Sequence, residues 1–193
     1  MRSIPTDPWT ILRQNTAEAH RRLEELPRLS RMFADDYRRE ELAEMLATML
    51  AIHRPLERAL AAGCDLAAFG YQPRSPLLDA DLVALDWAGT VAEVPFAPPP
   101  TADLGSCLLG IAYVIEGSML GGQVIRKRLI EQFGRPILSA CTFYSPYGEA
   151  AGEQWRRFRE ELDARLNHPD AITACAAAAL FTFEHFERAL AQS

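Results

Sequence analysis

The most constraining feature of this chain is a glycine-rich segment, residues 105–128, that otherwise has the pattern of one long helix. The segment holds five of the 11 glycines in a chain of 193 residues. Each glycine inside a helix costs about 1 kcal/mol relative to alanine. Five of them cost about as much as the whole net stability of a small domain. Some interaction must therefore offset this cost.

These glycines follow the helical period. At 100° per residue, Gly110, Gly117 and Gly121 project within about 20° of one direction, with Ser106 and Tyr113 beside them. A stripe without side chains has two interpretations: a close crossing by another helix, or a flat ligand lying against the backbone. A crossing covers one or two turns, whereas this stripe covers three, so its length favours the ligand.

Composition limits the classes of protein that fit. The chain is 49% hydrophobic and long enough for one well-buried domain over residues 1–193. A formal net charge of −6 argues against nucleic acid or an anionic membrane as the main partner. The first residues lack the apolar core of a signal peptide, and no membrane span is expected. The cysteines are widely scattered, so free thiols and a cytoplasmic location are expected: Cys64, Cys107, Cys141 and Cys175.

Helical spacing and capping signals recur along the chain, and no segment alternates with period two. The sequence therefore predicts an all-α fold. Pro55 is expected to bend the second helix. The expected helices cover residues 8–26, 35–62, 75–87, 101 or 103 to 134, 149–166 and 169–190, with a short helical turn after Pro136.

His20 is the strongest candidate for a metal ligand. Arg13, Thr16 and Glu24 lie on the same side of the first helix as His20. A histidine ligand works best when one ring nitrogen is free for the metal and the other donates to a carboxylate, which Glu24 can supply. The alternative is a surface His–Glu pair. The remaining histidines are expected to be structural or solvent-facing: His53, His168 and His185.

Two motifs together resemble those of the haem oxygenases, in particular the bacterial biliverdin-producing branch. The segment Thr16-Ala-Glu-Ala-His20-x-x-x-Glu24 resembles the proximal helix of that family. The segment Tyr113-Val-Ile-Glu-Gly117-Ser118-Met-Leu-Gly121-Gly122-Gln123 resembles its distal helix. The resemblance covers nearly the whole chain. It implies a multihelical bundle with haem between the first helix and a kinked, glycine-rich distal helix.

The resemblance also implies roles for individual residues. His20 would bind the haem iron through Nε2, with Glu24 as the partner of its other ring nitrogen. The distal side would consist of Gly117, Ser118, Gly121 and Gly122. The remaining haem contacts would be Arg13 and Tyr113 at the propionates, Arg156 as a weaker propionate candidate, and Phe183 or Phe181 at the porphyrin edge.

The implied reaction uses haem as both substrate and cofactor and molecular oxygen as co-substrate. It yields biliverdin, carbon monoxide and ferrous iron, with electrons from a donor protein such as a ferredoxin or a flavin reductase. Ser118 stands where animal members have an aspartate, so proton delivery would depend on Ser118, ordered water and the backbone near Gly117. Two alternatives remain: a haem carrier or sensor that does not degrade haem, and a thiaminase-like enzyme that uses Cys107.

Overall fold

The computed structural model describes residues 7–191, and helices are the regular secondary structure of that range. The prediction of an all-α fold is confirmed. In chain order the elements are α1 (Pro8–Glu24), α2 (Pro27–Arg31), α3 (Arg39–Ala61), α4 (Ser75–Ala84), α5 (Leu104–Phe133), the 3₁₀ turns η1 (Arg135–Ala140) and η2 (Gly148–Ala150), α6 (Ala151–Arg165) and α7 (Pro169–Ala191).

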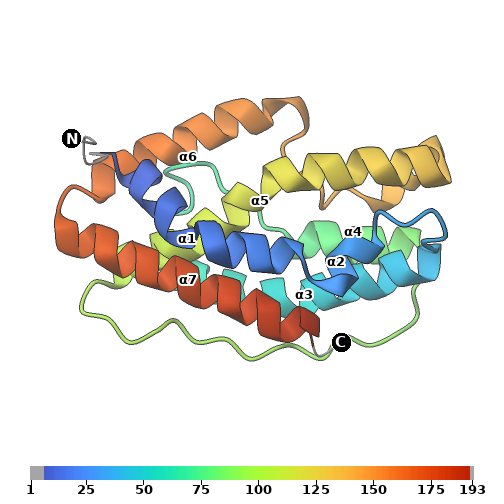
Figure 1. Ribbon diagram of the computed structural model, residues 1–193, viewed down its shortest axis with the longest axis horizontal. Coiled ribbons are helices and arrows are strands. Elements are labelled where there is room, and N and C mark those ends of the chain that lie inside the picture. Colours follow the sequence, from blue (N-terminus) through green and yellow to red (C-terminus); the bar gives the residue numbers. More distant parts are fainter. Residues whose placement is uncertain (1–6, 192–193) are drawn as a thin grey trace.

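The helices form a layered bundle around α5. Figure 1 shows α1 and α7 side by side at the front, with α5 running behind them along the molecule and α6 above. The ribbon of α5 changes direction near its middle (Figure 1), although its helical hydrogen bonding continues over 30 residues. The buried side chains form one hydrophobic core cluster, to which α1, α3, α4, α5, α6 and α7 all contribute. One domain over residues 1–193 stays a prediction.

The start of α1 explains its orientation. Asp7 Oδ1 accepts a hydrogen bond from Thr10 N at 2.8 Å, and Pro8 occupies the first turn, where no N–H is needed. Beyond the cap, side chains buried in the core recur at helical spacing: Leu12, Thr16 and Ala19. His20 follows Thr16 by one turn, at the edge of this buried side, and its side chain is 54% exposed.

Two glycines of α5 are explained by close packing. A Cβ at Gly110 would lie 2.2 Å from the carbonyl oxygen of Cys175 in α7, so α5 and α7 approach closely only because Gly110 has no side chain. A Cβ at Gly122 would lie 2.8 Å from the carbonyl oxygen of Tyr144. The helix-crossing interpretation is thus correct for Gly110. The part of the stripe that another helix leaves uncovered is therefore shorter than the three turns expected from the sequence.

The segment between α1 and α3 differs from the prediction. Pro27 begins a short helix, α2, which the sequence reading did not include. α3 begins at Arg39 rather than at Asp35, because Asp35 pairs with Arg128 at 2.7 Å and leaves the helix start to Arg38, whose N–H donates to Glu41 at 2.9 Å. α4 also ends at Ala84, three residues earlier than expected.

α5 is long and apolar enough to cross a membrane by length and composition, contrary to the expectation that no segment would be. However, 67% of the most apolar 18-residue stretch of α5 is buried inside the protein, as in the core helix of a bundle. All four cysteines are free, as expected. α3 continues as a helix through Pro55. The expectation about a signal peptide is based on residues 1–9, of which 1–6 lie outside the described residues.

Candidate haem site

His20 projects from α1 with one ring nitrogen occupied. Its Nδ1 lies 3.5 Å from Glu24 Oε2, and its side chain is 54% exposed. The edge of the imidazole packs on Phe183 of α7, with ring centroids 5.8 Å apart. Glu24 and Phe183 therefore orient the imidazole so that Nε2 is the nitrogen available to a ligand.

A polar contact joins α1 to α5 one turn before His20. Thr16 Oγ1 and the Tyr113 hydroxyl lie 3.4 Å apart, and Thr16 also donates to Leu12 O at 2.9 Å. Burial raises the pKa of Tyr113, so its hydroxyl stays protonated and available as a donor. α1 and α5 both run from left to right in Figure 1. Gly117 therefore lies one turn beyond Tyr113 in the same direction as His20 lies one turn beyond Thr16.

The glycines after this contact are open. A Cβ at Gly117 would meet only Trp155 Cη2, at 3.9 Å, which is ordinary van der Waals contact, and a Cβ at Gly121 would meet nothing within 4 Å. Gly117 and Gly121 are therefore not explained by packing within the chain. Gly122, predicted beside them as a haem contact, instead faces the backbone of Tyr144.

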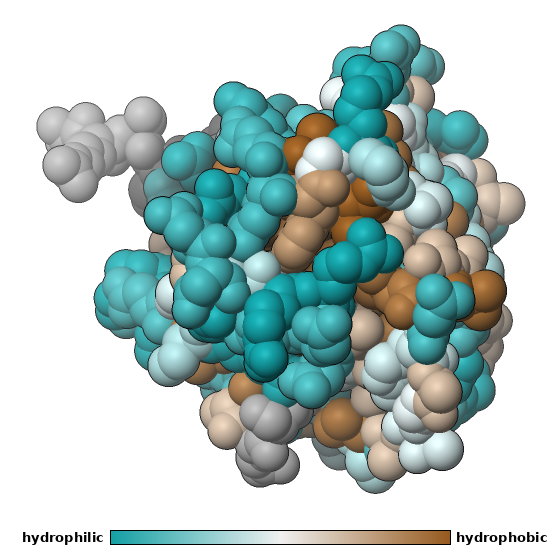
Figure 2. Space-filling model, turned by 90° about the vertical axis from the view of Figure 1, so that its right-hand side faces the viewer, coloured by the Kyte–Doolittle hydropathy of each residue, from teal (hydrophilic) through white to brown (hydrophobic). Residues whose placement is uncertain are grey.

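Two exposed apolar side chains lie on the same side of α5 as the open glycines. Leu120 and Val124 are each 59% exposed, and at 100° per residue they project within about 60° of Gly117. Figure 2 shows hydrophobic surface gathered in a hollow between hydrophilic rims, on the end of the molecule where the second half of α5 ends. A bare backbone flanked by exposed apolar side chains fits a flat, apolar ring such as a porphyrin. The helical period could have identified Leu120 and Val124 from sequence.

Ser118 is exposed beside the open glycines, and its hydroxyl is already in use. Ser118 Oγ donates to Ile115 O at 2.7 Å within the same helix. The hydroxyl proton is therefore held by the backbone, and the oxygen lone pairs remain free to accept. In this arrangement Ser118 can orient a water molecule that donates to it.

The arginines near the site divide into two groups. Arg13 lies over the Trp9 ring at 5.5 Å, and Arg159 lies over the same ring at 4.4 Å. The Nε of Arg159 is buried and has no hydrogen-bond partner among the described residues. Arg156, the propionate candidate from sequence, pairs with Glu160 on the surface of α6. Sequence reasoning missed Arg159, which the position of Trp9 reveals only in three dimensions.

Arg156 and Arg159 also line a cavity along α6. The cavity has a volume of about 370 Å³ and includes Trp155, the residue that lies against Gly117. All of its lining residues belong to α6, and the acidic side chains of Glu160 and Asp163 lie beside the two arginines. A carboxylate in this region would meet guanidinium groups that can bind it in a bidentate manner.

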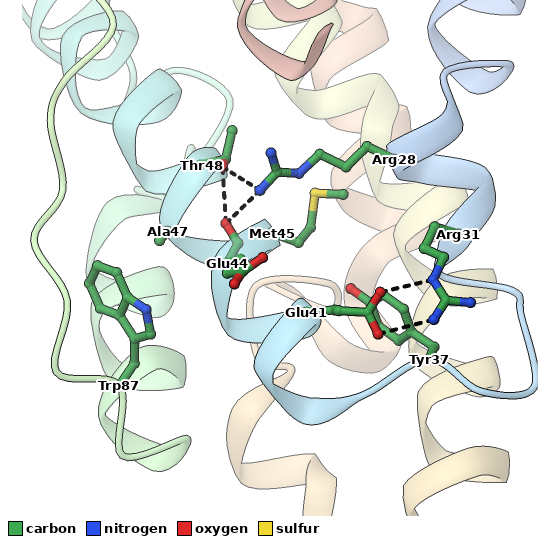
Figure 3. Close-up of a pocket in the computed structure, with 9 residues that line it drawn as sticks. All are labelled: Arg28, Arg31, Tyr37, Glu41, Glu44, Met45, Ala47, Thr48 and Trp87. Atoms are coloured by element: carbon green, nitrogen blue, oxygen red, sulfur yellow. Dashed lines mark hydrogen bonds and ion pairs between the residues drawn. The ribbon is translucent and has the colours of Figure 1, made fainter. Parts of the chain in front are cut away.

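A second cavity, of about 450 Å³, lies elsewhere, between α2, α3 and Trp87. Figure 3 shows that Arg28 and Arg31 reach across it toward the side chains of α3. Arg28 donates to Thr48 at 2.9 Å and Arg31 to Glu41 at 2.8 Å, so these groups satisfy one another. None of the residues predicted to bind haem lines this cavity.

Cys107 does not fit a catalytic thiol. Its side chain is buried, and burial raises its pKa above the ordinary value for a thiol. A reactive cysteine needs the opposite shift, toward a stable thiolate. The thiaminase-like alternative, which depended on Cys107, therefore loses its nucleophile.

Comparisons with known proteins identify the family. The family model described as heme oxygenase matches residues 9–94 and 99–192. The chain is 36% identical over 121 residues to the heme oxygenase of Xanthomonas campestris pv. campestris (strain 8004), covering 63% of this chain and 69% of that protein.

Two solved structures share the fold. The heme oxygenase of Leptospira interrogans has a TM-score of 0.72 at 18% identity, covering 97% of this chain and 100% of that one. The NO- and CO-bound heme oxygenase of Neisseria meningitidis has a TM-score of 0.71 at 20% identity, covering 97% and 92%. The resemblance seen in the two sequence motifs is thereby confirmed: this chain belongs to the heme oxygenase family.

Proposed function

We propose that this haem oxygenase binds haem between α1 and α5, with His20 Nε2 as the axial ligand of the iron, and opens the ring to biliverdin with molecular oxygen. The observation that carries this proposal is the imidazole of His20, whose Nδ1 faces Glu24 while Nε2 is left available. The open glycines of α5, Gly117 and Gly121, come after the Thr16–Tyr113 contact and form the other side of the proposed haem site.

Haem, when bound, supplies both the iron that activates oxygen and the ring that is oxidised. Glu24, whose Oε2 lies 3.5 Å from Nδ1 of His20, would accept the proton of that nitrogen and so leave the Nε2 lone pair free for the iron. Phe183 limits rotation of the imidazole. These contacts give the iron a neutral histidine ligand rather than a thiolate.

On the opposite side, Gly117 and Gly121 leave space at the backbone for a small diatomic molecule and for water. Ser118 accepts a hydrogen bond from that water because its own proton is held by Ile115 O. Proton delivery then depends on water ordered by Ser118 and by backbone carbonyls near Gly117, since a serine hydroxyl does not titrate in the physiological range.

We assign the propionates to the basic residues around Trp9. Arg13 and Arg159 both stack on that ring, and Arg159 has an unused buried Nε–H. The Tyr113 hydroxyl adds a neutral donor. Arg156 remains a candidate from the edge of the same cavity, although Glu160 competes for its guanidinium. Two anchored carboxylates fix the rotation of the ring about the iron.

The reaction also needs electrons, which amino-acid side chains do not supply. We therefore propose an electron-donor protein, either a ferredoxin or a flavin reductase, as a partner. Four free cysteines and the net charge of −6 support a cytoplasmic protein without a nucleic-acid or membrane partner.

The test is a hemin titration of His20→Ala alongside His168→Ala. The control variant also removes an exposed imidazole, but it loses only a cap of α7, in which Ala171 N donates to His168 Nδ1. We expect His20→Ala to lose the histidine-ligated spectrum and turnover, and His168→Ala to keep both. Normal ligation and turnover in His20→Ala would overturn the axial assignment.

Turnover of the wild-type protein separates an oxygenase from a carrier. With ascorbate or a reductase under air, the Soret band should decay while biliverdin absorption rises. A protein that binds hemin through His20 and leaves the Soret band intact would be a carrier or sensor.

The Glu24→Gln variant should lose about 10-fold in haem affinity or in activity, because loss of the hydrogen-bond partner of a ligating histidine has an effect of that size.

A further inference from the structure

The residue that precedes Gly117 is a fully buried charge. Glu116 is 0% exposed, and its Oε1 accepts a hydrogen bond from the guanidinium of Arg74, itself 1% exposed, at 2.7 Å. Arg74 comes from the segment just before α4, so the pair joins that segment to α5. Burial raises the pKa of Glu116, and the charge of Arg74 opposes that rise.

The carboxylate of Glu116 has partners from two further segments. The Tyr147 hydroxyl lies 3.0 Å from Oε1, and Gln154 Nε2 of α6 lies 3.3 Å from Oε2. Gln154 also donates to Phe69 O at 2.8 Å. Arg74 packs against the rings of Tyr71 and Tyr147, at 5.2 and 5.0 Å. Every oxygen of the carboxylate is therefore directed at a fixed donor.

A buried ion pair is seldom retained for stability alone, because apolar residues of similar volume stabilise a core equally well or better. What charged hydrogen bonds provide in addition is direction. Direction matters at this point of α5, since Gly117 and Gly121 have no side chains that could fix the rotation of the helix. The rotation must be set by neighbouring residues on another side of the helix.

The Glu116–Arg74 pair is also linked to Trp155, the other residue that lies beside Gly117. Gln154, which binds Glu116, directly precedes Trp155, whose Cη2 would lie 3.9 Å from a Cβ at Gly117. Trp155 also packs near Tyr113, with ring centroids 6.4 Å apart. The position of the Gly117 backbone and the position of the indole are thus coupled through one carboxylate.

We propose that Glu116 and Arg74 are positioning residues that fix the Gly117 backbone and Trp155 relative to the haem ring, and so decide which meso carbon is opened. The proposal rests on the assignment of Gly117 and Gly121 as the distal face. Neither residue touches haem; they act by holding α5 and α6 in one rotation and distance.

The test compares Glu116→Leu/Arg74→Met, which replaces the pair by apolar side chains, with Glu116→Gln, which leaves Arg74 without its countercharge. Asp81→Asn is the matched control. Asp81 is also 0% exposed, and its hydrogen bonds, from Thr142 N and Phe143 N at 2.9 Å each, come from the segment after α5 rather than from α5 itself. Urea midpoints identify the variants that fold.

Two readouts decide. In haem-free protein, hydrogen exchange at the amides of residues 117–122 should accelerate at least 10-fold in the double variant, with residues 108–113 unchanged. After turnover, chromatography should show the minor biliverdin isomers rising several-fold in the double variant, with Asp81→Asn giving the wild-type ratio.

Unchanged exchange in a folded double variant would overturn the proposal, whether or not the protein turns haem over. An unchanged isomer ratio despite faster exchange would also overturn it, because the pair would then be only structural. Absence of biliverdin from the wild type would instead contradict the oxygenase proposal, and hydrogen exchange would still test the role of the pair.

Discussion

The two halves of α5 use the same residue type for opposite purposes. In the first half, the backbone of α7 occupies the space beside Gly110, and the carbonyl of Cys175 lies close to where a side chain would be. In the second half, Gly121 faces open space and is flanked by exposed Leu120 and Val124. A glycine that packs is required for folding, whereas a glycine that faces nothing in the chain indicates a ligand.

The largest effect is expected in the packed half. Gly110→Ala should lower the free energy of unfolding by at least about 3 kcal/mol, because the added Cβ meets a backbone oxygen and α5 must move away from α7. Urea denaturation of the haem-free protein measures this. Wild-type stability in this variant would show that the crossing adjusts without cost.

The same contrast separates the histidines, since His20 is open and His53 is 2% exposed. Burial lowers the pKa of His53 to about 4; Glu57 opposes this shift and Arg74 adds to it. The unfolded chain therefore binds a proton near its ordinary pKa of 6.5 while the folded chain does not. Stability from the neutral imidazole is present above pH 6.5 and is lost as pH falls toward 4.

This loss should reach about 3 kcal/mol at most. Urea midpoints measured between pH 7 and pH 4 should fall less steeply for His53→Leu than for the wild type. Parallel curves for wild type and His53→Leu would contradict a buried, neutral His53.

In the open half, Gly121→Phe should reduce haem turnover at least about 10-fold, equivalent to about 1.4 kcal/mol, because the ring covers the distal face. Its urea midpoint should stay close to the wild type, since nothing lies within 4 Å. Gly121→Ala should stabilise the haem-free protein by up to about 1 kcal/mol through helix propensity. A loss of stability without a haem effect would reverse the comparison.

Gly122 gives the smallest effect and the sharpest boundary. Its Cβ would lie 2.8 Å from Tyr144 O, which is a less severe overlap than the 2.2 Å to Cys175 O at Gly110. Gly122→Ala should therefore cost about 1 kcal/mol in the urea midpoint and leave haem affinity unchanged. A haem titration that weakens several-fold would place Gly122 on the open side after all.

Helix positions were predictable because caps, prolines and apolar spacing are local signals. Ser75-Pro76 began α4 as expected and Gly134 followed the last residue of α5. α2 was not predicted, because Pro27 fits a stop as well as a start. The start of α3 was also predicted wrongly. Asp35 has the sequence pattern of a helix cap, and its ion pair with Arg128 joins segments that are far apart in the sequence.

The candidate site was predictable in part for the same reason. His20 and Glu24 lie one turn apart, and sequence alone placed them together. Arg159, Trp155 and the Arg74–Glu116 pair depend on contacts between distant segments, which no local period encodes. The helical wheel placed Gly110 and Gly121 on one stripe correctly, but which of them another helix covers is decided by tertiary packing.

The stacking of Arg13 and Arg159 on one indole has a consequence for the order of events. Two like charges from α1 and α6 are held close to the same ring, Trp9, and repel each other, with the Asp7 carboxylate offsetting part of the charge of Arg159. A dianionic edge that reaches both guanidiniums removes this repulsion. Propionates bound there as proposed would link haem binding thermodynamically to the docking of α6 on α1.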